Sequence, residues 1–215
     1  MVRPVSPWQV PGNRERQREL KRDAVILAAA RAFREHGYHN TSLDDIAAVL
    51  HVTKPTLYYY VASKEQMLFE CFREGLGRIA EACGHARRGS ASGRERLIAI
   101  VRGYVAAITS DFGWCMVRAE DQDLDPALSE RIKQLKSEID QEIRRHVRTG
   151  IADGSIGECD PKMVAFALAG ALNWIPHWYR DNASLPAGAI ADRFVELFVN
   201  GLAPRPEGAL PGKSS

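Results

Sequence analysis

The sequence lacks the features of a membrane or secreted protein. No apolar run among the 215 residues reaches the roughly 18 residues that a membrane-spanning helix needs. The opening segment, MVRPVSPWQVPGNRERQREL, also lacks the apolar stretch of a signal peptide. We therefore expect a cytoplasmic protein with no membrane partner.

Cysteine is scarce and scattered. The four cysteines are Cys71, Cys83, Cys115 and Cys159, and no C-x-x-C pair occurs. Disulfide frameworks and zinc sites need closely patterned cysteines, so this spacing predicts reduced thiols. We expect no metal and no cofactor.

Catalytic motifs are also missing. The chain has no H-E-x-x-H, no G-x-S-x-G, no P-loop and no histidine pair at ligand spacing. Residues 75–80, GLGRIA, match G-x-G-x-x-A, but they lie inside a predicted helix with no strand before it, which argues against a dinucleotide site. We expect no enzyme, and a small helical enzyme is the remote alternative.

The positive charge is concentrated at the front of the chain. Residues 1–22 carry six Lys or Arg against two Glu, so this stretch contributes +4 and the remainder −2 to the net charge of +2. We expect 1–18 to form a flexible basic arm, solvated or touching phosphates, and the Pro/Gly/Ser-rich segment 203–215 to be a disordered tail.

Between these ends the apolar residues repeat with a helical period, and no stretch shows the strict alternation of a half-buried strand. The sequence predicts an all-α fold of about nine helices. A helix-turn-helix domain should occupy 19–66 and a helical bundle 67–202. The expected helices are about 19–36, 43–50, 53–60, 63–83, 94–109, 112–120, 126–153, 160–180 and 187–202.

Residues 19–66 carry the pattern of three packed helices. The first helix has one apolar face and stops at Gly37. That face comprises Val25, Ile26, Ala29, Ala32 and Phe33. A second, short helix begins after Thr41 or Ser42 as N-cap and has acidic residues in its first turn.

A three-residue turn of His51, Val52 and Thr53 leads to the third helix, where Thr53 is the cap and Pro55 occupies the first turn. A capping box of Ser63 and Gln66 opens the fourth helix. Two short helices around a tight turn, braced by a longer helix, form the arrangement that places a helix in the DNA major groove.

The third helix and its flanks carry side chains suited to DNA. Thr53, Lys54 and Thr56 lie at its start, where they can reach base edges. With Leu57 and Tyr60 turned inward, Tyr58 and Tyr59 face outward toward phosphates or thymine methyls, and Lys64 is expected to hold a phosphate. The predicted DNA-contact set is Thr41, Ser42, Thr53, Lys54, Pro55, Thr56, Tyr58, Tyr59 and Lys64. The structural alternative is packed tyrosines and solvated lysines.

These motifs resemble a known family. The run VI-x-AA-x-x-AF-x-x-x-GY at 25–38 and the run TS-LDDIAAVLHVTKPTLYYYVASKE at 41–65 are similar to the signature of TetR/AcrR regulators. The resemblance implies an all-helical homodimer with a variable ligand-binding domain, which leaves a palindromic operator when an effector binds. Two departures stand out: His51 replaces the usual Gly of the turn, and Val61-Ala62 replaces a frequent Phe-Pro.

Aromatic residues in the second half predict an effector site. Trp174 and Trp178 share a helical face, and Pro176 between them should kink the helix and open space. The predicted effector residues are Phe72, Arg102, Phe112, Trp114, Met116, Arg118, Trp174, His177 and Trp178. The structural alternative for the tryptophan pair is core or dimer packing.

The runs GALNWIPHWYRD at 170–181 and IADRFVELFVNGL at 190–202 resemble a subgroup that controls fatty-acid or steroid breakdown and senses acyl-CoA. Arg102, Arg118 and Arg180 are candidates for its phosphates, with surface charges as the alternative. The runner-up effector is an apolar cation, as in efflux regulators. It would need a buried carboxylate, for which the candidates are Glu120, Asp121 and Asp123.

The last two helices offer more apolar surface than one helix pair needs, which predicts a four-helix dimer interface. The expected interface residues are Phe166, Leu168, Ala169, Leu172, Phe194, Leu197, Phe198 and Leu202. In the dimer the two third helices should lie about 34–36 Å apart, and the fourth helix should transmit the effector signal.

Overall fold

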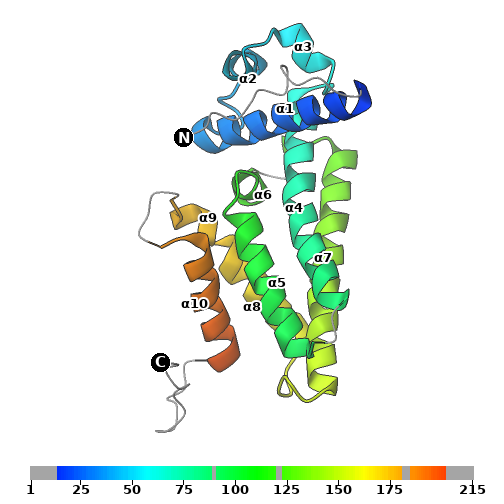
Figure 1. The fold of residues 1–215 in the computed structure, drawn as a ribbon, viewed down its shortest axis with the longest axis vertical. Helices are drawn as coiled ribbons and strands as arrows, with labels where there is room; N and C mark the ends of the chain where they lie inside the picture. Colours follow the sequence, from blue (N-terminus) through cyan, green and yellow to red (C-terminus); the bar gives the residue numbers. More distant parts are fainter. Residues whose placement is uncertain (1–13, 89–90, 120–122, 181–184, 202–215) are drawn as a thin grey trace.

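The computed structural model describes residues 14–88, 91–119, 123–180 and 185–201. Every regular element in these ranges is helical, which confirms the all-α prediction (Figure 1). The elements are α1 (Arg14–His36), α2 (Leu43–Leu50), α3 (Lys54–Tyr58), α4 (Lys64–Arg88), α5 (Gly93–Ile108), α6 (Gly113–Arg118), α7 (Pro126–Ala152), α8 (Pro161–Asn173), α9 (Ile175–Trp178) and α10 (Ala187–Asn200).

Helices α1 to α3 form a head that lies across the upper end of α4 (Figure 1). Phe33 of α1, Ile46 of α2 and Leu57 of α3 are fully buried, so each helix contributes a large apolar side chain to one core. Burying such a side chain contributes about 1.5–3 kcal/mol. This core fixes the orientation of α3.

The ends of the chain differ in part from expectation. Helix α1 begins at Arg14, five residues before the predicted start at 19, so the last part of the expected basic arm is helical. Residues 1–13 and the expected tail at 203–215 lie outside the described residues.

Helix α4 connects the head with the bundle (Figure 1). Ser63 Oγ accepts a hydrogen bond from the Gln66 backbone N–H at 3.0 Å, as the predicted cap requires. The Gln66 side chain donates instead to Glu70, so the capping box stays half-formed. The helix runs on to Arg88, past the expected end at Cys83, and reaches the far end of the bundle.

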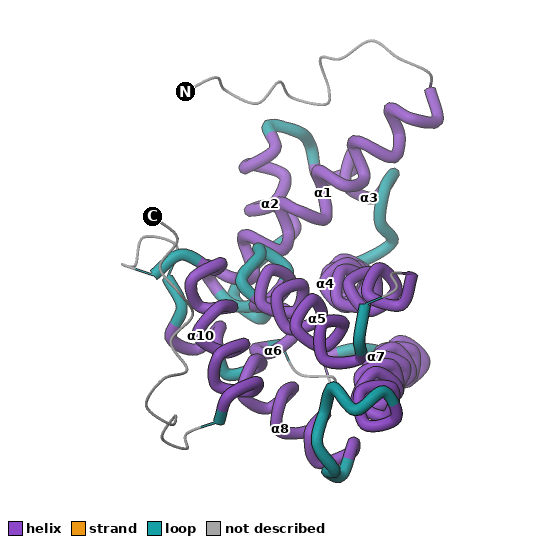
Figure 2. Tube along the Cα trace, turned by 60° about the horizontal axis from the view of Figure 1, so that its bottom comes forward, coloured by secondary structure: helices purple, strands orange, loops and turns teal. Residues whose placement is uncertain are grey.

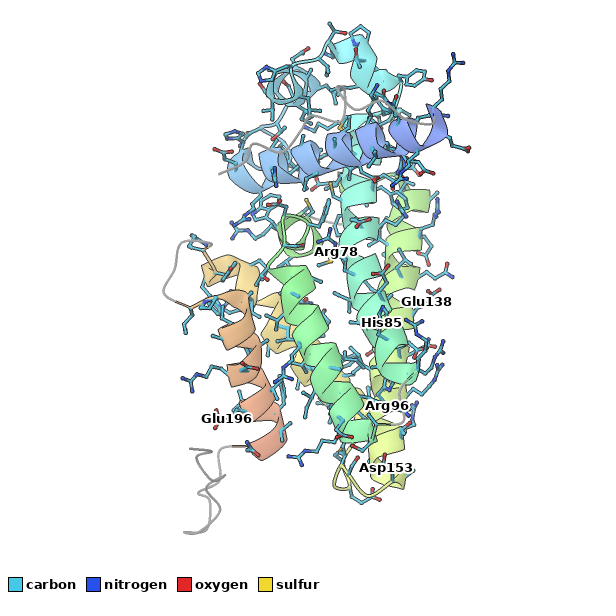
Figure 3. All side chains as sticks on the ribbon, viewed as in Figure 1. Arg78, His85, Arg96, Glu138, Asp153 and Glu196 are labelled. Carbon is cyan, nitrogen blue, oxygen red and sulfur yellow. The ribbon has the colours of Figure 1, made fainter. Side chains whose placement is uncertain are left out.

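In the bundle, α5 packs against α4, α7 and α10, and α8 packs against α7 (Figure 2). The backbones of α5 and α7 approach so closely that a Cβ on Gly93 would lie 2.1 Å from the Gly150 nitrogen, so only glycine fits. Asp153, labelled at the lower end of α7 in Figure 3, accepts a hydrogen bond from the Gly93 N–H at 2.7 Å. This bond caps α5.

The helix expected over 160–180 is interrupted as its proline predicts. Helix α8 ends at Asn173 and the single turn α9 begins at Ile175. Pro176 has no backbone N–H, and in a continuous helix its ring would clash with the Leu172 carbonyl, which explains the break. The nine expected helices thus become ten segments in the described ranges. None of the described helices is long and apolar enough to cross a bilayer.

Candidate functional site

Helix α3 presents a polar and aromatic surface to solvent. Tyr58 is 52% exposed and Tyr59 is 66% exposed, whereas Leu57 is buried as predicted. Thr53 and Pro55 are exposed at the start of the helix, next to the half-buried Lys54 and Thr56. The residues predicted to face DNA are therefore accessible on this helix.

The turn before α3 depends on the unusual residue identified in the sequence. His51 has φ 55° and ψ 41°, the left-handed conformation that favours glycine. Its backbone N–H donates to the Ala48 carbonyl at 3.1 Å and closes α2. His tolerates this region better than most residues, so the tight turn forms without Gly.

Thr41 is a wrong prediction for DNA contact. Its side chain is only 1% exposed, and its hydroxyl lies 2.8 Å from the Gly37 carbonyl oxygen and 3.2 Å from that of Ala32. Ser42 is exposed, but it is the N-cap of α2: its Oγ accepts from the Asp45 N–H at 3.1 Å. Both hydroxyls serve the fold of the head.

Local polar contacts hold the start of α3. The Thr53 and Thr56 hydroxyls lie 2.9 Å apart, in place of the backbone cap predicted for Thr53. Lys54 Nζ lies 2.9 Å from Asp44 Oδ2, and the hydrogen bond and charge of this carboxylate raise the pKa of Lys54. Exposed ion pairs are weak, so a phosphate can replace Asp44 as the partner of Lys54.

The Lys64 ammonium makes contacts within the protein and does not extend toward solvent to bind a phosphate. Its Nζ donates to the Thr41 carbonyl at 2.9 Å and lies 4.3 Å from the Tyr38 ring centroid. Burial lowers the pKa of Lys64, and the nearby Asp123 partly offsets this. In this state the ammonium ties the start of α4 to the loop between α1 and α2.

Sequence reasoning missed one cation beside α3. The Arg18 Cζ lies 5.5 Å from the Tyr59 ring centroid, a cation–π distance. Arg18 reaches this place because α1 begins at Arg14 and extends beyond the head core. The helical end of the expected basic arm therefore adds positive charge next to the exposed tyrosines.

A mainly apolar cavity of about 150 Å³, partly open to solvent, lies between α4, α5, α6, α7 and α8. Its lining residues are Leu76, Ile79, Tyr104, Met116, Lys136, Ile139, Asp140, Ile143, Ala165, Ala169 and Asn173. The Tyr104 hydroxyl donates to Asn173 Oδ1 at 2.9 Å. Burial raises the pKa of Tyr104 to about 12, so the phenol stays neutral at physiological pH. The cavity is the structural candidate for an effector site.

Of the residues predicted for the effector, Met116 lines this cavity and the others lie elsewhere. Trp174 is 62% exposed and stacks on His177, with 4.1 Å between ring centroids. Trp178, Arg118 and Arg180 are exposed. Arg102 is also exposed and forms an ion pair with Asp192. Phe72 and Phe112 lie in the core, and Trp114 is partly buried and packs against it. The two tryptophans therefore do not line this cavity, and a contact between them and an effector stays a prediction.

Cavity residues that sequence reasoning missed come from four helices, α4, α5, α7 and α8. Tyr104 and Asn173 are 69 positions apart, and helical periodicity alone gives no signal that they meet. Among the carboxylates proposed for a cationic ligand, Asp123 pairs with His39 at 2.9 Å, away from the cavity, and Glu120 and Asp121 lie outside the described residues.

The residues expected at a dimer interface separate into two groups. Phe166 is 50% exposed, and Leu197 is also exposed, whereas Phe194 and Phe198 are half-buried. Leu172 is fully buried inside the protomer, as is Leu168, and Ala169 lines the cavity. Leu168 and Leu172 were wrong for an interface, since their side chains are buried in the bundle core, whereas Ala169 is partly buried and stays a prediction. Leu202 lies outside the described residues.

Helix α6 joins the cavity to the head. Met116 lines the cavity and lies against α4, where a Cβ on Gly75 would come within 2.6 Å of its sulfur. Asp111, just before α6, accepts from Arg31 Nε at 2.8 Å and lies 3.3 Å from Arg34 Nη1, both on α1. Arg78 of α4, labelled in Figure 3, lies 4.8 Å from the Phe112 ring centroid. A shift of α6 would therefore displace the ion pairs that join it to α1.

A second connection links α1 directly to α4. The buried Glu70 carboxylate lies 2.7 Å from Arg22 of α1 and 2.7 Å from Arg73. Burial raises the pKa of Glu70, but hydrogen bonds and charge from the two arginines lower it more, so the net pKa lies below its ordinary value. This network keeps the head aligned on α4.

The buried thiols do not form a reactive site. Burial raises the pKa of Cys71 well above its ordinary value and that of Cys83 to about 11. Within the described ranges, no group of three or more His, Cys, Asp and Glu side chains is placed to hold a metal ion.

Comparison with known proteins accounts for both parts of the chain. Residues 25–71 match the family described as bacterial regulatory proteins, tetR family. Residues 90–202, about half of the chain, match the family described as tetracyclin repressor-like, C-terminal domain. The two matches correspond to the head with the start of α4 and to the bundle.

Individual relatives align over most of the chain. The fatty acid metabolism regulator protein of Bacillus subtilis is 23% identical over 87% of this chain and 98% of its own length. The HTH-type transcriptional repressor KstR2 of Rhodococcus jostii is 28% identical over 85% of this chain and 91% of its own. The structure of AibR in complex with isovaleryl coenzyme A and operator DNA superposes with TM-score 0.72, at 26% identity, over 83% of this chain and 98% of AibR.

The exposed helix α3 after the left-handed His51, the helical bundle with its apolar cavity and the two family matches all indicate the same family. The chain therefore belongs to the TetR family of bacterial regulatory proteins, a DNA-binding transcriptional regulator whose helix-turn-helix is formed by α2 and α3.

Proposed function

We propose that the chain acts in the cytoplasm as a homodimeric repressor that leaves its operator when an acyl-CoA thioester binds inside the bundle. One observation carries this proposal: the apolar cavity adjoins α6, and α6 packs on α1 of the DNA-binding head. The names of the fatty acid regulator and of AibR with isovaleryl coenzyme A support the same class of ligand.

The DNA contacts follow from α3. In a dimer the two copies of this helix would enter successive major grooves, about 34–36 Å apart. Thr53, Lys54 and Thr56 are our candidates for base edges, and Tyr58 and Tyr59 for phosphates. Pro55 lies among them in the first turn, and the first helix adds Arg18 beside Tyr59.

The dimer face that we propose uses the outer sides of α8 and α10. Met163 and Phe166 are exposed on α8, Trp174 is exposed just after its last residue, and Leu197 is exposed on α10. Large apolar patches on a soluble protein mark an interaction surface. Pairing these helices with their copies would give a four-helix interface and cover the exposed aromatics.

The charge of the cavity favours an acyl-CoA over an apolar cation. A buried cation needs an unpaired carboxylate. Among the described lining residues the one carboxylate is Asp140, which lies 2.5 Å from Arg144 and is already neutralised. Lys136 on α7 instead supplies positive charge at the cavity for the phosphates of coenzyme A.

Release would run through α6. An acyl group that displaces Met116 moves α6, and Asp111 at its start pulls on Arg31 and Arg34 of α1. The head would then turn relative to α4, and the spacing of the two α3 helices in the dimer would no longer match the operator. No catalytic step belongs to this scheme.

A paired experiment tests the function. Duplexes are first selected from random DNA by the full-length protein, and their affinity is then measured by fluorescence anisotropy with and without acyl-CoAs. We expect micromolar acyl-CoA to weaken binding and to raise the thermal midpoint of the protein. If cationic dyes do both and acyl-CoAs do neither, the efflux-type alternative is correct and the proposed effector is wrong.

A further inference from the structure

We infer that the first two turns of α1 form a second DNA-contact surface, on which Arg18, oriented by Tyr59, binds a backbone phosphate outside each half-site of the operator. A half-site is the stretch of DNA that one copy of α3 reads. This inference rests on the proposed function, because the dimer through α8 and α10 sets where the centre of the operator lies. It goes beyond that function by extending the DNA contacts past α3 and by defining the length of DNA that the dimer covers.

Three basic side chains share one face of the first two turns of α1. Arg14, Arg18 and Lys21 are spaced i, i+4 and i+7, which places them on the same side of a helix. Arg14 and Arg18 are exposed, and Lys21 is half-buried. The acidic residues of this stretch lie about 130° further round the helix, and they are Glu15, Glu19 and Asp23. No carboxylate of this stretch of α1 therefore lies on the basic face itself.

The contact between Arg18 and Tyr59 places this basic face beside α3. The Arg18 Cζ lies 5.5 Å from the Tyr59 ring centroid, and Tyr59 is the residue that directly follows α3. Both side chains are exposed. A ring against the flat side of a guanidinium restricts its orientation, while the N–H donors at its edge stay available to a further partner. Arg18 is therefore oriented next to the helix that enters the DNA.

The partner that fits this surface is the phosphate backbone of the same duplex. The basic face is continuous with α3 through the Arg18–Tyr59 contact, so DNA bound to α3 also comes close to α1. A guanidinium edge matches the oxygens of a phosphate and can bind two of them at once. Half or more of the hydrogen bonds between proteins and DNA go to phosphates and sugars, which position the protein without reading sequence. We therefore expect Arg18 to add affinity but no sequence preference.

The direction of α1 indicates which phosphate Arg18 reaches. The start of α1, drawn in dark blue, lies on the right of the head in Figure 1, whereas α10 lies on the left of the bundle, and Figure 2 shows the same separation. In the proposed dimer the two-fold axis passes beside α8 and α10, so the centre of the operator lies on that side of α3. Arg18 then lies on the side of α3 away from the centre, next to phosphates that flank the half-site. The dimer would cover DNA beyond both half-sites.

The test compares two duplexes with the same selected operator, one trimmed to its two half-sites and one extended at each end by a helical turn of about 10 base pairs. Fluorescence anisotropy measures the affinity of the full-length protein for each. The wild type should bind the extended duplex roughly tenfold more tightly, and Arg18→Ala should lose most of this difference with little change on the trimmed duplex. Arg16→Ala is the matched control and should behave as the wild type, because Arg16 is an exposed arginine about 160° round the same helix from Arg18.

The salt dependence of binding identifies the contact as one to phosphate. On the extended duplex, Arg18→Ala should reduce the slope of log affinity against log salt concentration by about two, one phosphate for each protomer. Arg18→Lys should keep the slope and lose part of the affinity, since an ammonium neither stacks on the ring nor binds two oxygens. An equal loss on both duplexes in Arg18→Ala, or a length dependence as large as that of the wild type, would overturn the inference and leave the proposed function intact. A wild type that binds neither duplex would overturn both.

Discussion

Replacing Asp111 by Asn should weaken the coupling between effector and operator while leaving each affinity close to its wild-type value. Asp111 is the acidic group that joins the start of α6 to Arg31 and Arg34 of α1. It neither lines the cavity nor lies on α3. Loss of its charge removes two ion pairs between the effector domain and the head.

The free energy that these ion pairs contribute depends on how exposed the three side chains are. The Asp111 side chain is 25% exposed, Arg34 28% and Arg31 63%. Solvent screens the Arg31 pair most, so the two pairs together contribute about 1–2 kcal/mol. Allosteric coupling amounts to about 1–3 kcal/mol, so Asp111→Asn should remove much of it. The effector-induced loss of DNA affinity should fall by roughly 5- to 30-fold.

The assay is the ratio of operator Kd values with and without saturating effector, measured by anisotropy for the wild type and Asp111→Asn. Asp192→Asn is the matched control, since Asp192 forms an arginine pair at 2.9 Å that joins α10 to α5 rather than to the head. An unchanged ratio in Asp111→Asn would refute the route through α6. A large loss of operator affinity without effector would show instead that Asp111 is needed to form the head.

Three further predictions concern the head and the dimer. Tyr59→Ala should reduce operator affinity about tenfold in anisotropy titrations and leave effector affinity and thermal midpoint unchanged, because the ring is exposed; a lowered midpoint would show a structural role. Glu70, with its lowered pKa, contributes stability that is complete above the ordinary glutamate pKa of about 4.3 and is lost as the pH falls through the lower folded value. Denaturation at several pH values should therefore show a weaker acid dependence in Glu70→Gln, and identical curves would refute this. Phe166→Glu should give monomers in sedimentation and abolish operator binding, and an unaltered dimer would exclude this face of α8.

Much of the head could be predicted because its signals are local. The cap of α2, the left-handed His51 and the proline that starts α3 each act within a few residues. Thr41 was misjudged for a related reason: a threonine at a helix start looks like a cap or a contact. Its hydroxyl instead bonds within the head, to the carbonyls of Gly37 and Ala32, the second of them nine residues earlier and outside any local capping rule.

The cavity could not be predicted because it depends on how five helices meet. Helical periodicity shows which side of a helix is apolar but not whether that side faces a cavity, the core or a second copy. Trp174 and Trp178 illustrate this, since Pro176 breaks the helix as expected yet both rings remain exposed. The polar residue Asn173 lines the cavity, but its hydrogen-bond partner Tyr104 lies on another helix, so the sequence does not show that the two meet.

The central claim is that this chain binds a specific operator and leaves it when an acyl-CoA enters the bundle. Its most direct test is an anisotropy titration of a selected duplex at physiological salt, with and without hexanoyl-CoA. We predict at least a thousandfold preference for the selected duplex over unrelated DNA, and an affinity that drops by tenfold or more with hexanoyl-CoA. Equal affinity for both duplexes, or operator binding that no acyl-CoA alters, would contradict the account.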